Sequence, residues 1–364
     1  MKYDLDLKAL MQQAAQFTRG GDLHAATAAI QAALQGRAPA AAPADATVGD
    51  DIIDVEARIV PGDPNPADSP APAAPGPQGD HAAQGPARFD GSHFSLGGLQ
   101  CDYKLFVPAG AGAAGPVPLV VMLHGCTQNP DDFATGTGMN DVAAAHGACV
   151  LYPAQSQRGN AQRCWNWFKH NHQTRGRGEP ALLAALTRDV MARLPIDPHR
   201  VYVAGLSAGG AMAAILGEAY PELYAAVGVH SGLAAGAATD LPGALAAMQG
   251  GANTPRTAAS GMPTISFHGD ADKTVHPRNG QQVVAASVGK RAPSATRTDR
   301  RPGGRTWTRD DFLGAQGAVV AERWTLHGTG HAWSGGSSRG SYTDPQGPDA
   351  SAEMMRFFLA HPRP

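Results

Sequence analysis

The chain has 364 residues, 43% of them hydrophobic and 16% charged, and its formal net charge at pH 7 is -2. This composition suits a globular protein with a large core, and the near-neutral charge argues against nucleic acid as a partner. No apolar run reaches the roughly 18 residues that a membrane-spanning helix requires, so we expect no membrane span.

The first 36 residues are predicted to form a helical hairpin. Apolar residues recur at helical spacing before and after the Gly20-Gly21 pair, in a pattern that resembles one tetratricopeptide-like repeat. A single repeat cannot bury its own face, so we expect it to pack on the main domain or on a copy of itself. Docking to a partner or to a polymer granule is the functional alternative, and the sequence leaves the oligomeric state open.

Residues 37–88 are rich in alanine, proline, glycine and aspartate and contain few large apolar side chains. Burial cannot offset the ordering entropy of such a segment, so we predict a disordered linker that precedes one catalytic domain over residues 89–364. The N-terminus carries Asp4 and Asp6 where a signal peptide would carry basic residues, which favours a cytoplasmic location.

Within residues 89–364, segments with strand character alternate with segments of helical character. Strands are expected at 91–96, 100–108, 118–123, 149–152, 201–206, 225–229, 264–268 and 319–326, and helices at 131–146, 179–194, 208–220, 278–286 and 350–360. This alternation predicts an α/β protein with a mostly parallel, doubly wound sheet. The basic run at 290–309 is expected to be a solvated loop, with contact to an anionic partner as the alternative.

Ser207 is the candidate nucleophile. It lies in Gly205-Leu206-Ser207-Ala208-Gly209, a G-x-S-x-G pattern between an apolar strand and an alanine-rich helix. A serine on a sharp strand-to-helix turn has a strained backbone, and the glycines leave the space that this turn needs. The alternative is an ordinary serine in a tight turn.

A serine nucleophile needs a histidine to take its proton and an acid to hold that histidine. In doubly wound hydrolases the acid and then the histidine follow the serine along the chain, each after a later strand. We assign the acid to Asp272 in preference to Asp270, and the histidine to His331 in preference to His327.

Two backbone N–H groups are expected to stabilise the oxyanion that forms in the reaction. One belongs to Ala208, the residue after the nucleophile. The other is expected from the loop His124-Gly125-Cys126-Thr127-Gln128, where Cys126 is the preferred donor.

Five motifs in the same order resemble the polyhydroxybutyrate depolymerase family of esterases, which is similar to the feruloyl and acetyl xylan esterases. They are 123–128 (LHGCTQ), 164–168 (CWNWF), 205–210 (GLSAGG), 268–275 (HGDADKTV) and 330–336 (GHAWSGG). The resemblance covers residues 90–361. It implies the α/β-hydrolase fold and places Ser207, Asp272 and His331 on the family's triad positions.

The resemblance also implies an activity, namely hydrolysis of carboxylic esters and of polyhydroxybutyrate or hydroxyalkanoate oligomers in particular. A feruloyl or acetyl xylan esterase is the alternative, and a granule- or partner-binding protein that acts through the hairpin is the non-enzymatic one. Family members that act outside the cell carry a signal peptide, which this N-terminus lacks, and no polymer-binding domain follows the catalytic region. We expect no cofactor, metal ion or phosphate loop.

Two further expectations depend on the resemblance. The first is a disulfide between Cys126 and Cys164, although the four cysteines alone allow three pairings and a reducing compartment would favour thiols. The second is a substrate-binding set of Trp165, Trp333, His124 and Thr127, because aromatic rings offer flat apolar area to an acyl or phenolic group. The alternative for the tryptophans is core filling.

Overall fold

The computed structural model describes residues 85–251, 259–314 and 317–364. The expected hairpin and nearly all of the expected linker lie outside these residues. Among the helices of the described part, none is long and apolar enough to cross a membrane.

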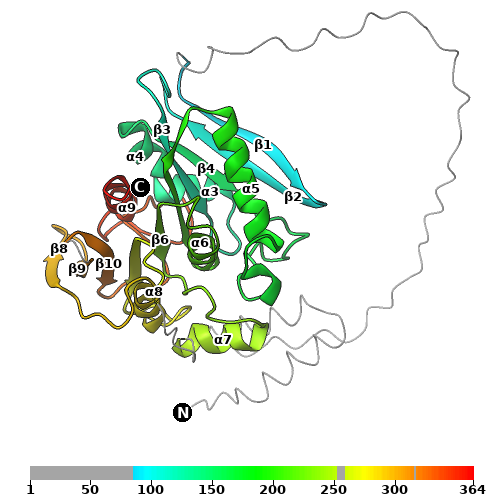
Figure 1. Cartoon of the computed structure of the whole chain (residues 1–364). Helices are drawn as coiled ribbons and strands as arrows, with labels where there is room; N and C mark the ends of the chain where they lie inside the picture. The colour runs from blue at the N-terminus through cyan, green and yellow to red at the C-terminus, as the bar shows by residue number, and fades with distance from the viewer. Residues whose placement is uncertain (1–84, 252–258, 315–316) are drawn as a thin grey trace, which may run out of the picture. The chain divides into compact units, whose positions relative to one another are not determined.

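The described chain is built on a ten-stranded sheet in the order β1-β2-β4-β3-β5-β6-β7-β10-β9-β8 (Figure 1). The strands are β1 Arg88–Leu96, β2 Leu99–Val107, β3 Val117–Leu123, β4 Cys149–Pro153, β5 Ile196–Leu206, β6 Ala226–His230, β7 Thr264–Gly269, β8 Ala295–Arg300, β9 Thr306–Leu313 and β10 Val319–Leu326. The six central strands, from β4 to β10 in this order, are parallel, whereas the pairs at both edges are antiparallel. The predicted mostly parallel, doubly wound sheet is therefore confirmed.

Helices cover both faces of the sheet. One face carries α3 Pro130–Thr137, α4 Met139–Ala145 and α9 Ala350–Leu359, and the other carries α5 Gly178–Arg193, α6 Ala208–Ala219 and α8 Arg278–Val288, with α7 Leu241–Gly250 against α8. A 3-10 turn, η1 His170–His172, precedes α5, and two short parallel strands, β11 Trp333–Ser334 and β12 Thr343–Asp344, follow β10.

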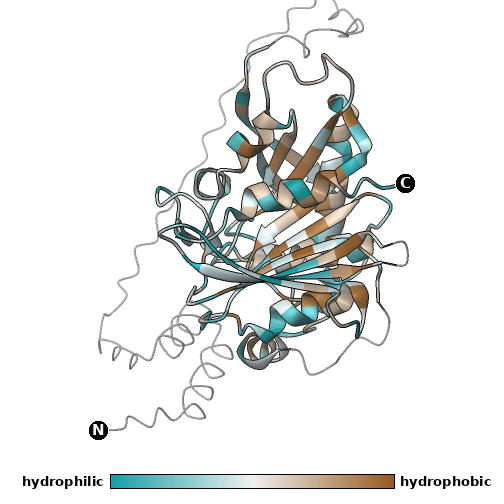
Figure 2. Ribbon diagram, turned by 90° about the vertical axis from the view of Figure 1, so that its left-hand side faces the viewer, coloured by the Kyte–Doolittle hydropathy of each residue, from teal (hydrophilic) through white to brown (hydrophobic). Residues whose placement is uncertain are grey.

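The central strands are buried on both sides. In β3, Leu119, Val121 and Leu123 belong to the core cluster under α5 and α6, while Val120 and Met122 belong to the cluster under α9. Hydrophobic colouring is accordingly concentrated in the inner strands (Figure 2). A strand with helices on both faces reads as a continuous apolar run rather than an alternating one.

The predicted helix over residues 131–146 is two helices. Gly138 adopts φ 62°, in the left-handed region, and is the cap shared by α3 and α4. Glycine takes this conformation without the steric cost that a Cβ would add, so the helix ends there and restarts in a new direction.

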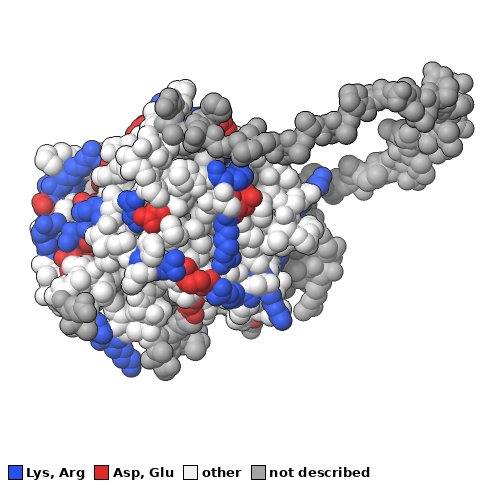
Figure 3. Space-filling model, turned by 45° about the horizontal axis from the view of Figure 1, so that its top comes forward, with Lys and Arg blue, Asp and Glu red and all other residues white. Residues whose placement is uncertain are grey.

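The expectation that residues 290–309 form a solvated loop is wrong for half of that segment, which forms β8 and the start of β9 at the edge of the sheet. The cross-strand pair Arg323–Asp310 has an N–O distance of 2.6 Å, and Arg297 lies over the ring of Trp307. The contact of Arg297 gives one arginine of the edge strand β8 a partner on β9, and basic side chains gather in this part of the surface (left in Figure 3). A charged edge strand also discourages pairing with other chains.

Candidate active site

The candidate residues follow four parallel strands. Loops from the carboxyl ends of β3, β5, β7 and β10 carry Cys126, Ser207, Asp272 and His331, respectively. These strands lie in the order β3-β5-β6-β7-β10, so their carboxyl ends meet at one edge of the sheet. This edge is where ligands bind in open α/β sheets.

Ser207 lies on a strained turn between β5 and α6. Its backbone has φ 56° and ψ −117°, a conformation that residues with a side chain rarely adopt. A Cβ on Gly205 would lie 2.4 Å from the carbonyl carbon of Gly209, and a Cβ on Gly209 would lie 2.0 Å from the carbonyl oxygen of Leu123. Only glycine fits at both positions, so the G-x-S-x-G pattern has a direct steric cause.

Asp272 and His331 form a hydrogen-bonded pair. His331 Nδ1 donates to Asp272 Oδ2 over 2.7 Å, while the backbone N–H groups of Thr274 and Val275 both donate to Asp272 Oδ1 over 2.9 Å. The Asp272 side chain is fully buried, and that of His331 is 12% exposed. Burial by itself would raise the pKa of Asp272, but the hydrogen bond and charge of His331 with the backbone donors hold that pKa below its usual value.

The alternative acid and histidine pair with each other instead. His327 Nδ1 donates to Asp270 Oδ2 over 2.8 Å, and the Gly328 N–H donates to Asp270 Oδ1 over 2.7 Å. His327 Nε2 lies 2.8 Å from the hydroxyl of Thr308, which comes from the middle of β9 and not from a strained turn. Asp270 therefore stabilises the backbone at Gly328, at the start of the loop that carries His331.

His230, at the end of β6, accepts hydrogen bonds from the backbone of Ser207 and from the segment that follows His331. The Ser207 N–H donates to the His230 carbonyl over 2.9 Å, and the Ser334 N–H donates to His230 Nε2 over 3.0 Å. The described part of the chain contains no hydrogen bond between Ser207 Oγ and His331. Catalytic hydrogen bonds are often long in ligand-free enzymes. The sequence reasoning missed His230, although a polar residue at the end of a buried strand next to β5 marks it.

The two candidate oxyanion donors are free. The N–H groups of Cys126 and Ala208 donate no hydrogen bond within the described residues, whereas the flanking N–H of Gly125 donates to Gln128 Oε1 and that of Thr127 to the Gln162 carbonyl. Ala208 begins α6, so its amide also lies at the positive end of a helix dipole.

The loop around Cys126 is covalently tied. The structure joins Cys126 to Cys164, which lie 38 residues apart, and so connects this loop to the tryptophan-rich segment before α5. Cys101 and Cys149 are buried free thiols, and burial raises their pKa values to about 12 and about 11. Buried thiols with raised pKa values behave as small hydrophobic groups.

Trp165, Trp333 and His124, the expected substrate-binding residues, are each only 1% exposed, which favours the alternative of core filling for the two tryptophans. Trp165 Nε1 donates to the His124 carbonyl over 3.1 Å, and Trp333 Nε1 donates to the hydroxyl of Ser351 over 3.1 Å. His124 Nδ1 donates to the Gly125 carbonyl, and its Nε2 accepts the N–H of Gln155. The polar atoms of these rings are thus engaged in hydrogen bonds inside the protein.

Thr127 is the exception in the expected substrate set. Its side chain is exposed, its φ is 66°, and its hydroxyl donates to the Cys126 carbonyl over 2.6 Å.

The buried His124 predicts acid sensitivity of the fold. Burial lowers the pKa of His124 from 6.5 to about 4, so between these values the unfolded chain binds a proton that the folded chain does not. Stability is therefore complete above pH 6.5 and falls as the pH decreases through this window, by about 3 kcal/mol at pH 4 from this residue alone. Burial lowers the pKa values of His230 and His268 as well, which acts in the same direction.

Urea unfolding at pH 7.5 and pH 4.5 measures this effect. We expect the difference in unfolding free energy between the two pH values to be smaller for His124→Gln than for the wild type, because the variant lacks one titrating group. An equal difference in both proteins would contradict the role given to His124.

A second Ser-His-Asp arrangement lies on the β1–β2 hairpin. His93 Nδ1 donates to Asp102 Oδ1 over 2.7 Å, and His93 Nε2 lies 3.1 Å from Ser95 Oγ. Its histidine and aspartate side chains are 50% and 80% exposed, and Ser95 sits within a regular strand rather than before a helix. It therefore lacks the strained turn and the helix N-terminus that Ser207 has, and Ser95 serves as a matched control.

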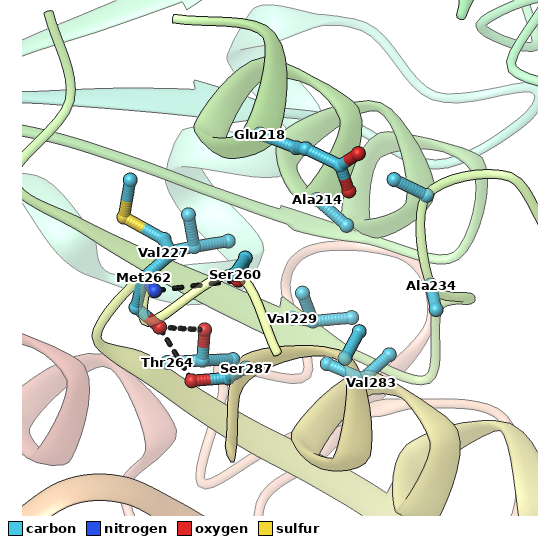
Figure 4. Close-up of a pocket in the computed structure, with 12 residues that line it drawn as sticks. Ala214, Glu218, Val227, Val229, Ala234, Ser260, Met262, Thr264, Val283 and Ser287 are labelled. Atoms are coloured by element: carbon cyan, nitrogen blue, oxygen red, sulfur yellow. Dashed lines mark hydrogen bonds between the residues drawn. The ribbon is translucent and has the colours of Figure 1, made fainter. Parts of the chain in front are cut away.

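A small cavity lies apart from this site. It has a volume of about 30 Å³ and lies between α6, β6, β7 and α8, where mostly small and apolar side chains such as Ala214, Val229 and Val283 line it (Figure 4). A cavity of this volume holds about one or two water molecules and is too small for an ester substrate. None of the candidate residues lines it.

The mostly parallel sheet with helices on both faces, and the strained turn between β5 and α6, are features of the α/β-hydrolase fold. A solved structure shares this fold. The acetyl xylan esterase from Aspergillus awamori superposes with a TM-score of 0.57 at 20% identity, over 71% of this chain and 94% of that one.

The chain belongs to the family described as Esterase PHB depolymerase, whose model matches residues 101–307, and this confirms the predicted family. Poly(3-hydroxyalkanoate) depolymerase C of Paucimonas lemoignei is 32% identical over 245 residues, which cover 63% of this chain and 58% of that protein. Feruloyl esterase B of Neurospora crassa is 33% identical over 129 residues, which cover 34% of this chain and 43% of that protein.

The family and these relatives carry the names of esterases and depolymerases. The chain spans between about half and three fifths of the lengths of the first two depolymerases that it matches. Ser207, Asp272 and Cys126 lie inside the residues that the family model matches, whereas His331 lies beyond them.

Proposed function

We propose that this chain is a serine esterase that hydrolyses oligomers of hydroxybutyrate or related hydroxyalkanoates through Ser207, His331 and Asp272. The observation that carries the proposal is the 2.7 Å hydrogen bond from His331 to the buried Asp272, at the sheet edge where Ser207 occupies its strained turn. A structural serine would not need that turn.

The reaction runs in two stages. His331 Nε2 takes the proton of Ser207 Oγ while the oxygen attacks the ester carbonyl, and Asp272 stabilises the imidazolium through the Nδ1 hydrogen bond. The free N–H groups of Cys126 and Ala208 stabilise the tetrahedral oxyanion. His331 then gives the proton to the departing alcohol, which leaves Ser207 acylated. Water attacks the acyl-enzyme by the same route, which releases the acid and restores Ser207.

Asp272 is well suited to its role. Its lowered pKa keeps the carboxylate ionised at neutral pH, and the two backbone donors on Oδ1 leave Oδ2 to face His331. An ionised acceptor holds the imidazole with its proton on Nδ1, so that Nε2 is free to accept the proton of Ser207.

The substrate class is proposed from the relatives. The match to the depolymerase of Paucimonas lemoignei extends over 245 residues, and the match to the feruloyl esterase over 129 residues at similar identity. A feruloyl or acetyl xylan esterase is the second candidate, because both kinds of enzyme are among the relatives.

A substrate panel distinguishes these candidates. We expect the highest kcat/KM with 3-hydroxybutyrate dimer to tetramer esters, lower values with methyl ferulate and acetylated xylan, and release of soluble products from amorphous polyhydroxybutyrate. A higher kcat/KM with ferulate or acetylxylan would favour the second candidate. Hydrolysis of none of these esters would overturn the esterase assignment.

A further inference from the structure

Tyr342 is an exposed aromatic residue at the candidate active site. It lies between β11 and β12 in the loop region that follows His331, and it is 47% exposed, the highest value among the large apolar and aromatic side chains that stand out at the described surface. It also lies beyond the residues that the family model matches.

Tyr342 connects the two loops that would flank a bound ester. On one side, the backbone N–H of Trp333, which comes two residues after His331, donates to the Tyr342 carbonyl over 2.7 Å. On the other side, the Tyr342 hydroxyl lies 3.2 Å from the hydroxyl of Thr127, the residue after Cys126.

The direction of this hydrogen bond follows from the neighbouring one. The Thr127 hydroxyl donates its one hydrogen to the Cys126 carbonyl over 2.6 Å. In the ligand-free protein, Tyr342 is therefore the donor in its hydrogen bond with Thr127 Oγ1. A rotation of the phenol O–H therefore frees a donor for a ligand and leaves the Thr127–Cys126 hydrogen bond intact.

The turn that carries Tyr342 is held firmly. Asp132 accepts the Ser341 N–H over 2.8 Å and the Ser341 hydroxyl over 2.5 Å, and Gln128 Nε2 donates to the Ser341 carbonyl over 3.2 Å. These contacts place the aromatic ring before a ligand arrives, which lowers the entropy lost on binding. Because Ser341 and Gln128 engage the carboxylate of Asp132, the adjoining surface suits an uncharged ligand.

Both exposed partners have strained backbones. Thr127 has φ 66° and Tyr342 has φ 53°, in the left-handed region that disfavours β-branched and bulky residues. Glycine would fit at either position without this strain. Strained conformations of this kind cluster at ligand-binding sites, because the surrounding structure holds the side chain for a purpose other than stability.

We propose that Tyr342 and Thr127 form a subsite for the ester unit next to the one that is cleaved, so that the site selects esters with at least two linked units. The ring packs against the aliphatic part of that unit, and the phenol O–H donates to its carbonyl oxygen. The inference rests on the proposed function, since it takes Ser207 as the point of attack.

The test compares a 3-hydroxybutyrate trimer ester with p-nitrophenyl acetate, which has one ester unit. We expect Tyr342→Ala to lower kcat/KM for the trimer by roughly tenfold to a hundredfold, mainly through KM, and to change kcat/KM for the acetate by less than about threefold. Tyr342→Phe keeps the ring and should lose less than Tyr342→Ala. Leu99→Ala, on a side chain of similar exposure in the β1–β2 hairpin, should change neither substrate.

Two outcomes would overturn the subsite. An equal loss on both esters would mean that Tyr342 only braces the Cys126 loop, and a wild-type enzyme that cleaves the acetate but not the trimer would leave no second unit to bind. The second outcome would also remove the proposed oligomer substrate, whereas a wild type that hydrolyses neither ester would overturn the esterase activity itself. A wild type that cleaves both esters, with an equal loss in Tyr342→Ala, would overturn the subsite and leave the proposed function standing.

Discussion

Replacement of Ser207 by alanine is expected to lower kcat for a chromogenic ester by about 10⁴- to 10⁶-fold while the fold stays intact. The hydroxyl is the proposed nucleophile, and a methyl group in its place cannot form the acyl-enzyme. The space around the turn is set by Gly205 and Gly209 and by the backbone, so removal of one oxygen leaves it unchanged. Circular dichroism and thermal melting should match those of the wild type.

Ser95→Ala is the matched control for this experiment. Ser95 Oγ lies 3.1 Å from His93 Nε2, and His93 Nδ1 donates to Asp102, but Ser95 lies on an exposed strand. We expect the wild-type rate from Ser95→Ala. Full activity of Ser207→Ala would exclude Ser207 as the nucleophile. Loss of activity in Ser95→Ala would place the active site on the hairpin.

Replacement of Asp272 by asparagine is expected to lower kcat by about 10³- to 10⁴-fold. The backbone N–H groups of Thr274 and Val275 both require an acceptor at the position of Oδ1, so the amide nitrogen of the new side chain must face His331. That nitrogen is a donor and forces His331 Nδ1 to accept. The ring proton then sits on Nε2, where it blocks transfer from Ser207.

Asp270→Asn separates the two possible acids. Asp270 contacts His327 and the Gly328 N–H at the surface, so the same change there should leave kcat within a few-fold of the wild type. Steady-state kinetics of both variants on one chromogenic ester gives the comparison. A larger loss from Asp270→Asn than from Asp272→Asn would reverse the assignment of the acid.

The sequence predicts the parallel sheet well because its signals are local. The apolar runs at 118–123 and 264–268 and the glycine-rich turns after them indicate buried strands followed by sharp loops. The carboxyl ends of parallel strands lie at one edge of a sheet, which brings Ser207, Asp272 and His331 to that edge, whereas the order of the strands comes from the structure.

Side-chain roles that depend on distant packing could not be predicted in this way. Whether an indole faces a ligand or the core depends on partners such as Ser351 and Phe133, which lie on helices far from Trp333 in the sequence. Tyr342 was missed for a related reason: it lies between two-residue strands, and no motif marks it. The arginine-rich β8 was missed because charge hides the alternation that normally indicates a strand.

The bridge between Cys126 and Cys164 ties the position of a proposed oxyanion donor to the oxidation of two thiols. The sheet, α6 and the Asp272–His331 pair contain no oxidised sulfur and can form from reduced chains, whereas the loop that carries the Cys126 amide is covalently fastened only after oxidation. The covalent tie of this loop therefore depends on the redox potential of the surroundings, whereas the hydrogen bonds of the Asp272–His331 pair do not require oxidised sulfur.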